Sequence, residues 1–490
     1  MNKFSQRVSV LAVAATFTML AMPAVAQQYE AAGILKRTAN NLGAGTLNTI
    51  TYSAAGNGWG FGQPYTFGKA LPRQNYRVTR SIDYVNGAIS DDVTRSRAEL
   101  KGGTGVPLTG EQNAIEAAGG NVTWNVVNKN VQPGNRYVYD RLPQIWMNPH
   151  GIIKAAQKNN GTLTFVTEGG KSLGVVSFSE AGRFNAKVYI NDAAEVARIE
   201  AVVHNPVVGD MSVVEKFSEY REFAGGVKFP SRIEESQGGQ PTLQLVVTDV
   251  QPNAKVAIEV PAAAANFKES VATTKLADGV WLLAGGSHNS LAIEMKDYAV
   301  VVEGPLYDAR SQAVIDETKK LIPAKPIRYL LNTHAHYDHS GGVATFAAEG
   351  ATIVTNQANK PFYEKAMSNK RTVSPDALAK SKKKAKIQGV GDKFVLSDGN
   401  HSVEMHLQKG VIHNDALMMV YLPKEKILVQ ADVFAPLPAG ATPPANPSPQ
   451  YTLVSNFAEN IERLKLPVER IVGIHGGVAP FAELAKAMGK

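Results

Sequence analysis

The chain has 490 residues, which is too long for one ordinary domain and favours about three. Hydrophobic residues make up 44% and charged residues 19%, a balance that excludes a wholly disordered protein. The 51 Lys and Arg against 43 Asp and Glu give a formal charge of +8. Cysteine is absent, which excludes disulfides, thiolate metal ligands and a cysteine nucleophile. Any metal ion must therefore be held by imidazole and carboxylate groups.

Residues 1–26 have the layout of a secretory signal peptide. Lys3 and Arg7 precede an apolar run from Val8 to Met22, and Ala24-Val25-Ala26 supplies small residues before a cleavage site. The run is shorter than the ~20 residues of a membrane span, although an uncleaved anchor is the alternative. We expect a periplasmic or secreted protein that is cleaved after Ala26. Its charge then falls to +6, because Lys3 and Arg7 are lost, and this mild value does not favour nucleic-acid binding.

Residues 27–262 are expected to form a β-rich, mainly antiparallel domain. Apolar residues alternate with polar ones from Phe184 to Ile190 and from Leu243 to Val247, the period of strands with one buried face. Glycine-rich turns separate such runs. The stretch from about Arg183 to Pro252 weakly resembles the curved sheets of periplasmic lipoprotein-carrier domains. That resemblance implies a concave surface for an acyl chain or another apolar ligand; the alternative is a domain that only packs against a catalytic one.

The alanine-rich segment that begins at Pro261 marks the joint between the halves, and we expect a linker at 263–275. Residues 276–490 then alternate strand and helix patterns. The apolar spacing from Ala309 to Ile322 predicts a helix that ends before Pro323. The order of elements indicates an α/β domain.

The candidate chemistry begins with His334-Ala-His336-Tyr-Asp338-His339, which follows the expected strand IRYLLNT. Residues two apart in an extended segment point the same way, so His334 and His336 can hold one ion together. Asp338 and His339 come where the chain turns and can face a second ion. Strand ends in α/β proteins are the usual place for such sites. Three further residues lie at or beside expected strand ends: His413, Asp432 and His475.

The pattern HxHxDH, followed by His, Asp and His, resembles that of the metallo-β-lactamase superfamily over about Lys275 to Lys490. The resemblance implies an αββα sandwich with two Zn²⁺ ions per chain; iron or manganese is an alternative. It implies one ion on His334, His336 and His413, a second on Asp338, His339 and His475, and Asp432 bridging both. A hydroxide shared by the ions would attack a carbonyl carbon, with Asp338 as the catalytic residue that orients it or passes its proton. The alternative is a closed structural zinc site.

We therefore expect an exported dinuclear zinc hydrolase for an ester, lactone or amide. Its partner would be a small-molecule substrate, hydrophobic if the N-terminal sheet delivers it, with no nucleic acid and no stable membrane span. β-Lactam hydrolysis is the alternative. The resemblance weighs against it, because two β-lactamase classes carry Cys and the third Ser near the position of Asp432. An alternative from another class is a periplasmic protein that binds an apolar ligand and uses the metal domain as a scaffold.

Several other polar residues are interpreted as supporting ones. Asp415 is expected to hold a ligand imidazole in place, and Glu303 stands where many superfamily members carry Asp. The loop residues His288 and Asn289 are expected beside the metals in a supporting or core role. The remaining histidines are expected to be structural: His150, His204, His401 and His406.

Two segments with a biased composition remain. Lys380 to Lys386 contains five lysines and is interpreted as a solvated face, with a guide for anionic substrates or for an anionic membrane surface as the alternative. Pro436 to Pro449 contains six prolines and follows Asp432, so it is a candidate wall or lid of the active site.

Overall fold

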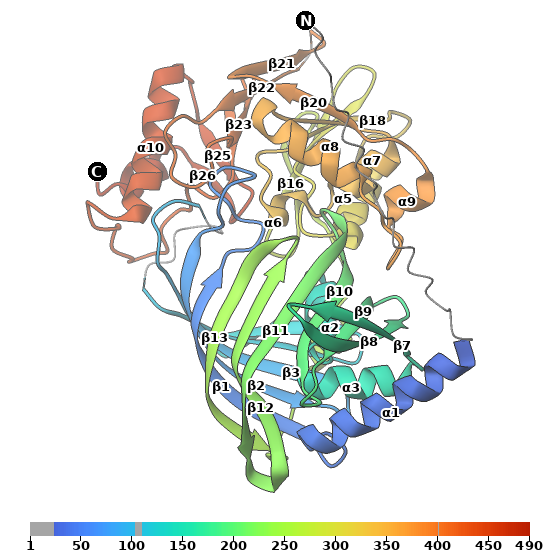
Figure 1. Ribbon diagram of the computed structural model, residues 1–490. Helices are drawn as coiled ribbons and strands as arrows, with labels where there is room; N and C mark the ends of the chain where they lie inside the picture. Colours follow the sequence, from blue (N-terminus) through green and yellow to red (C-terminus); the bar gives the residue numbers. More distant parts are fainter. Residues whose placement is uncertain (1–23, 103–109, 400) are drawn as a thin grey trace, which may run out of the picture.

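The computed structural model of the protein describes residues 24–102, 110–399 and 401–490 (Figure 1). The expected signal segment therefore lies outside the described residues up to position 23, and Ala24 to Ala26 begin helix α1 (Ala24–Leu42). Within the described ranges, the helices are all too short or too polar to cross a membrane.

The N-terminal half is built on one antiparallel sheet, which has 13 strands within the described residues in the order β6-β5-β4-β3-β2-β1-β13-β12-β11-β10-β9-β8-β7. The strands are β1 (Thr49–Trp59), β2 (Arg73–Asp83), β3 (Ala88–Arg97), β4 (Gln112–Gly119), β5 (Val122–Val127), β6 (Asn130–Pro133), β7 (Thr162–Glu168), β8 (Lys171–Glu180), β9 (Phe184–Ile190), β10 (Val196–Asn205), β11 (Gly209–Phe223), β12 (Val227–Gln237) and β13 (Gln240–Pro252). Neighbours along the chain are joined mainly by hairpins, so the expectation of a mainly antiparallel region is confirmed.

One face of this sheet is covered by helices. Besides α1, these are the 3-10 turn η1 (Asn135–Tyr137), α2 (Val138–Gln144) and α3 (Pro149–Lys158), while η2 (Ala224–Gly226) forms a turn between β11 and β12. In β9 the apolar side chains of Phe184, Ala186 and Val188 are buried, while Asn185 and Lys187 are exposed. The period of two therefore places every second residue in the core beneath the helices. Figure 1 shows the sheet as a curved surface with α1 and α3 packed at one end.

The C-terminal half contains two mixed sheets. The first consists of β14 (Ala272–Ala277), β15 (Val280–Ala284), β16 (Ser290–Glu294), β17 (Ala299–Val302), β18 (Ile327–Leu331), β19 (Thr352–Asn356) and β20 (Lys386–Val390), and is parallel from β17 onward. The second consists of β21 (Lys393–Ser397), β22 (Ser402–Leu407), β23 (Met418–Leu422), β24 (Ile427–Gln430), β25 (Arg470–Gly473) and β26 (Val478–Pro480).

One hydrophobic core lies between these two sheets. Leu291 and Val302 of the first sheet belong to the same buried cluster as Val420 and Val429 of the second. The other face of the first sheet packs on helices, as Ile315 and Phe346 show. The helices of this half are α5 (Asp308–Leu321), α6 (Tyr337–Ser340), α7 (Val343–Glu349), η3 (Gln357–Asn359), α8 (Lys360–Ser368), α9 (Ala377–Ser381), α10 (Pro449–Leu464) and α11 (Ala482–Ala487).

The segment expected to be a linker differs from that expectation. Helix α4 (Ala262–Ala265) begins just before it, and Ala272–Ala277 pairs with β15 as an edge strand of the C-terminal sheet. The reason is the tight turn at Asp278 and Gly279, where Gly279 has a φ of 71°. This turn brings the residues before it alongside Val280–Ala284, so the C-terminal sheet begins at Ala272.

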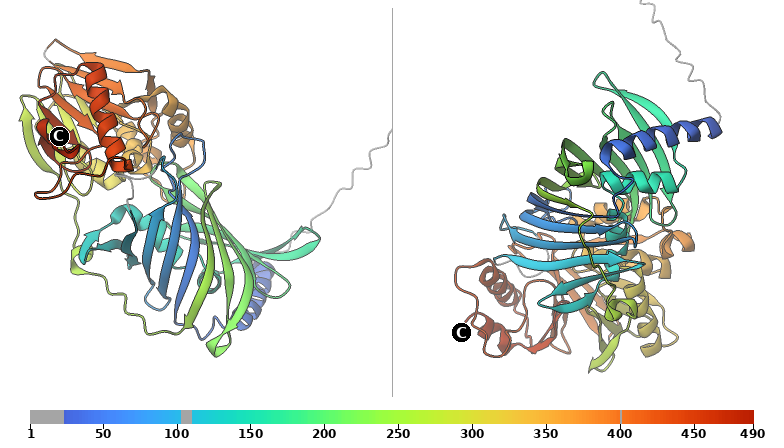
Figure 2. Two further views of the ribbon diagram at one scale, coloured as in Figure 1. Left: turned by 90° about the vertical axis from the view of Figure 1, so that its left-hand side faces the viewer. Right: turned by 90° about the horizontal axis from the view of Figure 1, so that it is seen from below.

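The two halves are joined by direct contacts as well as by the chain (Figure 2). The loop at 60–72, between β1 and β2, reaches the C-terminal half, where the Tyr337 backbone N–H donates to the Gly62 carbonyl at 3.2 Å. At a second contact, the Asp210 carboxylate accepts from the backbone N–H groups of Thr372 and Val373 at 2.8 and 3.1 Å. These contacts hold the N-terminal half against the first C-terminal sheet, on the side where the histidine and aspartate motif follows β18.

Candidate metal centre

The motif residues are positioned by the end of β18. That strand ends at Leu331, His334 and His336 follow in non-helical backbone, and Asp338 and His339 lie in the single turn α6. The ring centroids of His334 and His336 are 4.5 Å apart. The change from extended backbone to a helical turn divides the four side chains into two groups.

The first group consists of His334, His336 and His413, whose potential ligand atoms lie within 4.8 Å of one another. The Nε2 atoms of His334 and His413 are 3.2 Å apart. His336 donates from Nε2 to the Pro64 carbonyl at 2.9 Å, which leaves its Nδ1 buried without a hydrogen-bond partner. Two imidazoles thus present Nε2 and one presents Nδ1 to a common point.

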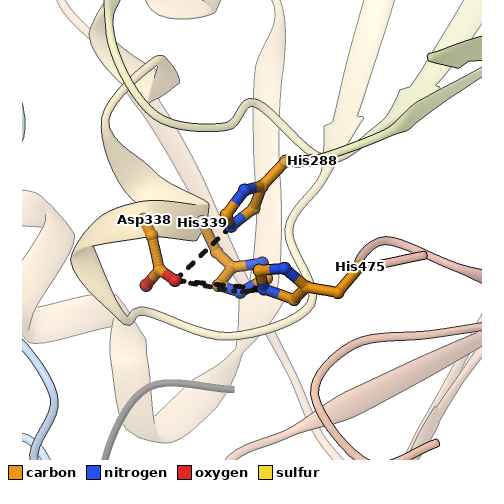
Figure 3. A group of neighbouring side chains, drawn as sticks. All are labelled: His288, Asp338, His339 and His475. Carbon is orange, nitrogen blue, oxygen red and sulfur yellow. Dashed lines mark hydrogen bonds and ion pairs between the residues drawn. The ribbon is translucent and has the colours of Figure 1, made fainter. Parts of the chain in front are cut away.

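The second group consists of His288, Asp338, His339 and His475, whose side chains converge in Figure 3. The Nε2 atoms of His339 and His475 are 3.2 Å apart. Asp338 Oδ2 lies 3.4 Å from His288 Nε2 and 3.9 Å from His475 Nε2. His288 therefore belongs to the group itself, whereas the sequence led us to expect a supporting or core role.

Asp432 lies between the two groups. Its Oδ2 is 2.9 Å from His339 Nε2 and 3.5 Å from the Nε2 atoms of both His334 and His413. Its Oδ1 is 3.0 Å from His475 Nε2. The residue follows β24 with a φ of 65°, and its carboxylate is buried. One carboxylate thus faces both groups: Oδ2 lies near histidines of both, and Oδ1 lies near His475 of the second group.

The electrostatics at His334, His413 and Asp432 favour the protonation states of metal ligands. Burial lowers the pKa of His413 to about 3 and that of His334 well below its usual value, so both rings are neutral at pH 7. Burial would raise the pKa of Asp432, but His339 and His475 hold it well below its usual range. Neutral imidazole and ionised carboxylate are the forms that bind metal ions. His339 is the exception: burial lowers its pKa, but Asp432 and Asp338 raise it well above its usual value, so this ring must release a proton when it binds a metal ion.

The donor set also contains atoms that lack partners in the protein. His336 Nδ1, His288 Nε2 and both carboxylate oxygens of Asp432 are buried without a hydrogen bond. A buried polar atom left in this way costs about 1–3 kcal/mol. Cations between the two groups would satisfy these atoms, and nitrogen and oxygen donors suit zinc, iron or manganese. The residues present therefore fit a metal centre.

Buried polar side chains hold the candidate ligands in place. Glu303 accepts a hydrogen bond from His339 Nδ1 at 3.0 Å and from Asn332 Nδ2 at 3.0 Å, and it also contacts Thr333. Asn289 donates to the carbonyls of Gly473 and Gly476, which flank His475. Glu303, which stands where many superfamily members carry Asp, thus orients the candidate ligand His339 directly.

The supporting role expected of Asp415 is wrong. Asp415 accepts a hydrogen bond from Thr66 and contacts no imidazole in the described residues, because the loop at 60–72 lies beside it. Pro436–Pro449, the candidate wall or lid, does not line the cavity beside the metal centre.

The remaining histidines lie outside both groups. His401 is 3.1 Å from Glu425 and His406 is 2.7 Å from Glu404. His150 contacts the Leu42 carbonyl, and His204 lies edge to face with Tyr139. The lysines from Lys380 to Lys386 are exposed, as expected of a solvated face.

Two participants in the site were missed in the sequence. Gln63 Nε2 donates to Asp338 Oδ1 at 2.7 Å, and the Pro64 carbonyl accepts from His336. Both come from the loop at 60–72 in the other half of the chain. A glutamine and a backbone carbonyl carry no metal-binding signature, so only the fold could reveal them.

A cavity of about 530 Å³ lies beside the metal centre. His288, Asp338 and His475 form one end of it. Its other walls come from the N-terminal half and are largely polar and charged: Gln63, Gln74, Arg80, Asp91, Arg95, Gln112, Glu116, Arg136, Asp140, Arg141, Gln144, Glu235 and Gln237, with aromatic surface from Trp59, Tyr76 and Tyr137. Phe61, Ile89 and Leu243 also line the cavity, so its walls combine polar, charged and apolar side chains.

Comparison with known proteins finds a match to one family model in the C-terminal half. Residues 283–475 match the family model described as the Metallo-beta-lactamase superfamily. The resemblance drawn from the histidine and aspartate motif is thus confirmed for this half of the chain.

A curated relative, the 2,4-dinitroanisole O-demethylase subunit alpha of Nocardioides sp. (strain JS1661), is 22% identical over 192 residues. The match covers 39% of this chain and 51% of the relative, so the chain spans about half the length of that protein.

Two solved structures are also similar, and each aligns with 45% of this chain. The metallo-beta-lactamase from Pontibacter korlensis is 17% identical, the alignment covers 98% of its chain, and the TM-score is 0.34. The metallo-beta-lactamase FIM-1 from Pseudomonas aeruginosa in its mono-zinc form is 19% identical, the alignment covers 94% of its chain, and the TM-score is 0.32.

Proposed function

We propose that the protein is an exported dinuclear zinc hydrolase whose metallo-β-lactamase-type domain, an αββα sandwich, cleaves an ester, lactone or amide. The observation that supports this most directly is the place of Asp432, whose two oxygens face the two histidine groups at 2.9–3.5 Å. His334, His336 and His413 would hold one ion, and Asp338, His339 and His475 the other. Two bound Zn²⁺ ions would lower the pKa of water to near 7 and polarise a carbonyl group.

The protein's own residues are arranged for a reaction at the cavity end of the centre. Asp338 is buried and lines the cavity, and Gln63 holds its Oδ1 so that Oδ2 faces His288, His339 and His475. A carboxylate fixed at this boundary can orient a nucleophile and accept or return a proton. His475 is the most exposed candidate ligand, with a 30% exposed side chain, so a substrate in the cavity meets this side of the centre first.

The cavity disfavours the alternative in which the protein only carries an apolar ligand. An apolar molecule would desolvate four arginines and five carboxylates without giving them hydrogen bonds, which is unfavourable. A polar small molecule would replace the water that those groups bind.

Metal removal tests the proposal. We expect about two zinc ions per chain by elemental analysis and turnover of an ester, lactone, amide or β-lactam chromogen that a chelator abolishes and zinc restores. An aryl methyl ether belongs in the panel, because the curated relative is an O-demethylase subunit.

Matched variants make the test specific to the site. Asp432→Ala and His413→Gln should lose metal and lower turnover by orders of magnitude, whereas His406→Gln, a buried histidine of the same half outside both groups, should keep both. Full metal content and full turnover in Asp432→Ala would contradict a centre bridged by this carboxylate.

A further inference from the structure

The N-terminal half forms most of the cavity that ends at the metal centre, so its charges decide what can occupy that space. Four arginines line the cavity: Arg80, Arg95, Arg136 and Arg141. The volume of about 530 Å³ is within the range of small-molecule sites. A ligand there would lie between these arginines and the side chains of Asp338 and His475.

Three of the four arginines are already paired with carboxylates. Arg80 forms a two-fold contact with Asp91 at 2.8 and 2.7 Å. Glu116 is 2.7 Å from Arg95 and 3.4 Å from Arg141. These pairs leave little positive charge for a ligand, because each guanidinium already faces an anion.

Arg136 is different, since within the described parts of the chain it has no ion pair and no side-chain hydrogen bond and interacts with Glu116 only at longer range. Its guanidinium lies 4.5 Å from the centroid of the Tyr137 ring, which fixes it without neutralising it. It is half-buried and lines both this cavity and an adjoining one that also reaches Gln63 and Asp338.

Asp140 is a further charged group of the cavity without an ion pair in the described residues. It lies one helical turn after Arg136, in α2. Its negative charge would repel a second anionic group near the first. Glu235, in contrast, is satisfied by hydrogen bonds from Gln144, Gln237 and Thr242.

We infer that the cavity binds a substrate with a single anionic group, a carboxylate or its equivalent, which pairs with Arg136 while the scissile bond lies toward Asp338 and His475. This inference rests on the proposed function, because it places the reacting end of the ligand at the metal centre. The planar guanidinium offers two parallel N–H donors to a carboxylate, a match that a neutral ligand cannot make. Substrate choice then belongs to the N-terminal half, and bond cleavage to the C-terminal half.

Binding calorimetry on the purified full-length protein tests this without any need for turnover. The probes are 4-nitrobenzoate and its neutral counterpart 4-nitrobenzamide, which differ in charge and little in shape. We expect the carboxylate to bind at least tenfold more tightly to the wild type, and this preference to vanish in Arg136→Met. Arg136→Lys should retain part of the preference, because the charge remains while the two-donor geometry is lost.

Arg328→Met is the matched control. Arg328 also lies over tyrosine rings, at 5.2 Å from Tyr298 and 5.6 Å from Tyr329, but it is exposed on β18 and does not line the cavity. It should keep the wild-type preference. Two results would overturn the inference. One is a preference for the carboxylate that is equal in Arg136→Met and the wild type, which would place the anion at the metal ions instead. The other is no preference for the carboxylate in the wild type.

The two proposals can fail separately. A protein that binds the carboxylate through Arg136 but hydrolyses nothing in the chromogen panel would contradict the proposed function and leave this inference standing. Chelator-sensitive hydrolysis, together with carboxylate binding that does not depend on Arg136, would support the proposed function and contradict this inference.

Discussion

At the scale of single residues, the candidate centre depends on side chains that touch no metal themselves. Glu303 orients His339, Asn289 fixes the backbone around His475, and Gln63 holds Asp338 from the other half of the chain. Residues in this position commonly change metal affinity 10- to 100-fold when they are replaced. Gln63 is the most informative of the three, because it alone reports whether the N-terminal half contributes to the centre.

We predict that Gln63→Leu lowers the affinity for the second metal ion by roughly tenfold or more. In this variant Asp338 loses its 2.7 Å hydrogen bond, while the volume of the side chain at position 63 is nearly kept. The measurement is competition for zinc against a chelator of known affinity. Gln74→Leu is the control, because Gln74 lines the same cavity without contacting Asp338. Wild-type affinity for both ions in Gln63→Leu would show that this hydrogen bond is incidental.

At the scale of elements, helix α3 links the parts of the N-terminal core through a buried histidine. His150 contacts the carbonyl of Leu42, the last residue of α1, at 3.0 Å and stacks on Phe229 of β12 at 5.8 Å. Asn148 caps α3 by accepting from the Gly151 N–H, and Pro149 occupies the first turn. The histidine therefore lies where two helices and the sheet meet, in a space that favours its neutral form.

This location predicts acid sensitivity. Burial lowers the pKa of His150 from 6.5 to about 4, although the hydrogen bond with Leu42 opposes the shift. Between these values the unfolded chain binds a proton that the folded chain does not, so stability is lost as the pH falls from 6.5 toward 4. At pH 5 the loss is about 2 kcal/mol relative to pH 7.

Urea unfolding at pH 7 and pH 5 measures this effect. His150→Gln should be less stable at pH 7, yet it should lose about 2 kcal/mol less than the wild type between the two pH values. The comparison uses the difference between pH values, so the cost of the substitution itself cancels. An identical loss in the variant would place the acid sensitivity elsewhere.

At the scale of the whole molecule, several contacts join the halves into one structure, among them the loop at 60–72 and the Asp210 carboxylate. The loop at 60–72 covers the metal centre, and Gly62, with a φ of 72°, lies so close to the Tyr337 ring that a larger residue would meet it. The second contact is the Asp210 carboxylate on Thr372 and Val373, beside the hydrogen bond from Arg371 to the Val207 carbonyl at 3.1 Å. We expect these contacts to keep the cavity of the N-terminal half aligned with the metal centre.

We predict that the wild type unfolds in one calorimetric transition and that Asp210→Ala separates or broadens it, with a loss of about 2 kcal/mol. The carboxylate accepts from Thr372 N, Thr372 Oγ1 and Val373 N at 2.6–3.1 Å, and its removal leaves those donors without an acceptor. Asp192→Ala, at an exposed turn of the same half, should leave the scan unchanged. One unaltered transition in Asp210→Ala would show that this contact does not couple the halves.

The sequence by itself determined the candidate ligands and the character of each half. His334, His336, Asp338 and His339 share one strand end, and local spacing within a strand or turn is enough to group them. Period-two alternation similarly marks β9 and β13, because one face of an antiparallel sheet is buried. Such features depend on neighbours a few residues away, so they are visible in a single sequence.

Only the tertiary structure decided what surrounds the metal centre. Gln63 and Asp338 are 275 positions apart, and no periodicity connects them. The same holds for Arg136, whose lack of a carboxylate partner is visible only once its neighbours in the cavity are known. It also holds for Asp415, whose carboxylate accepts a hydrogen bond from Thr66 in the loop at 60–72. Long-range packing determines such contacts, because a residue's partners across the fold depend on how whole sheets dock and not on the letters beside it.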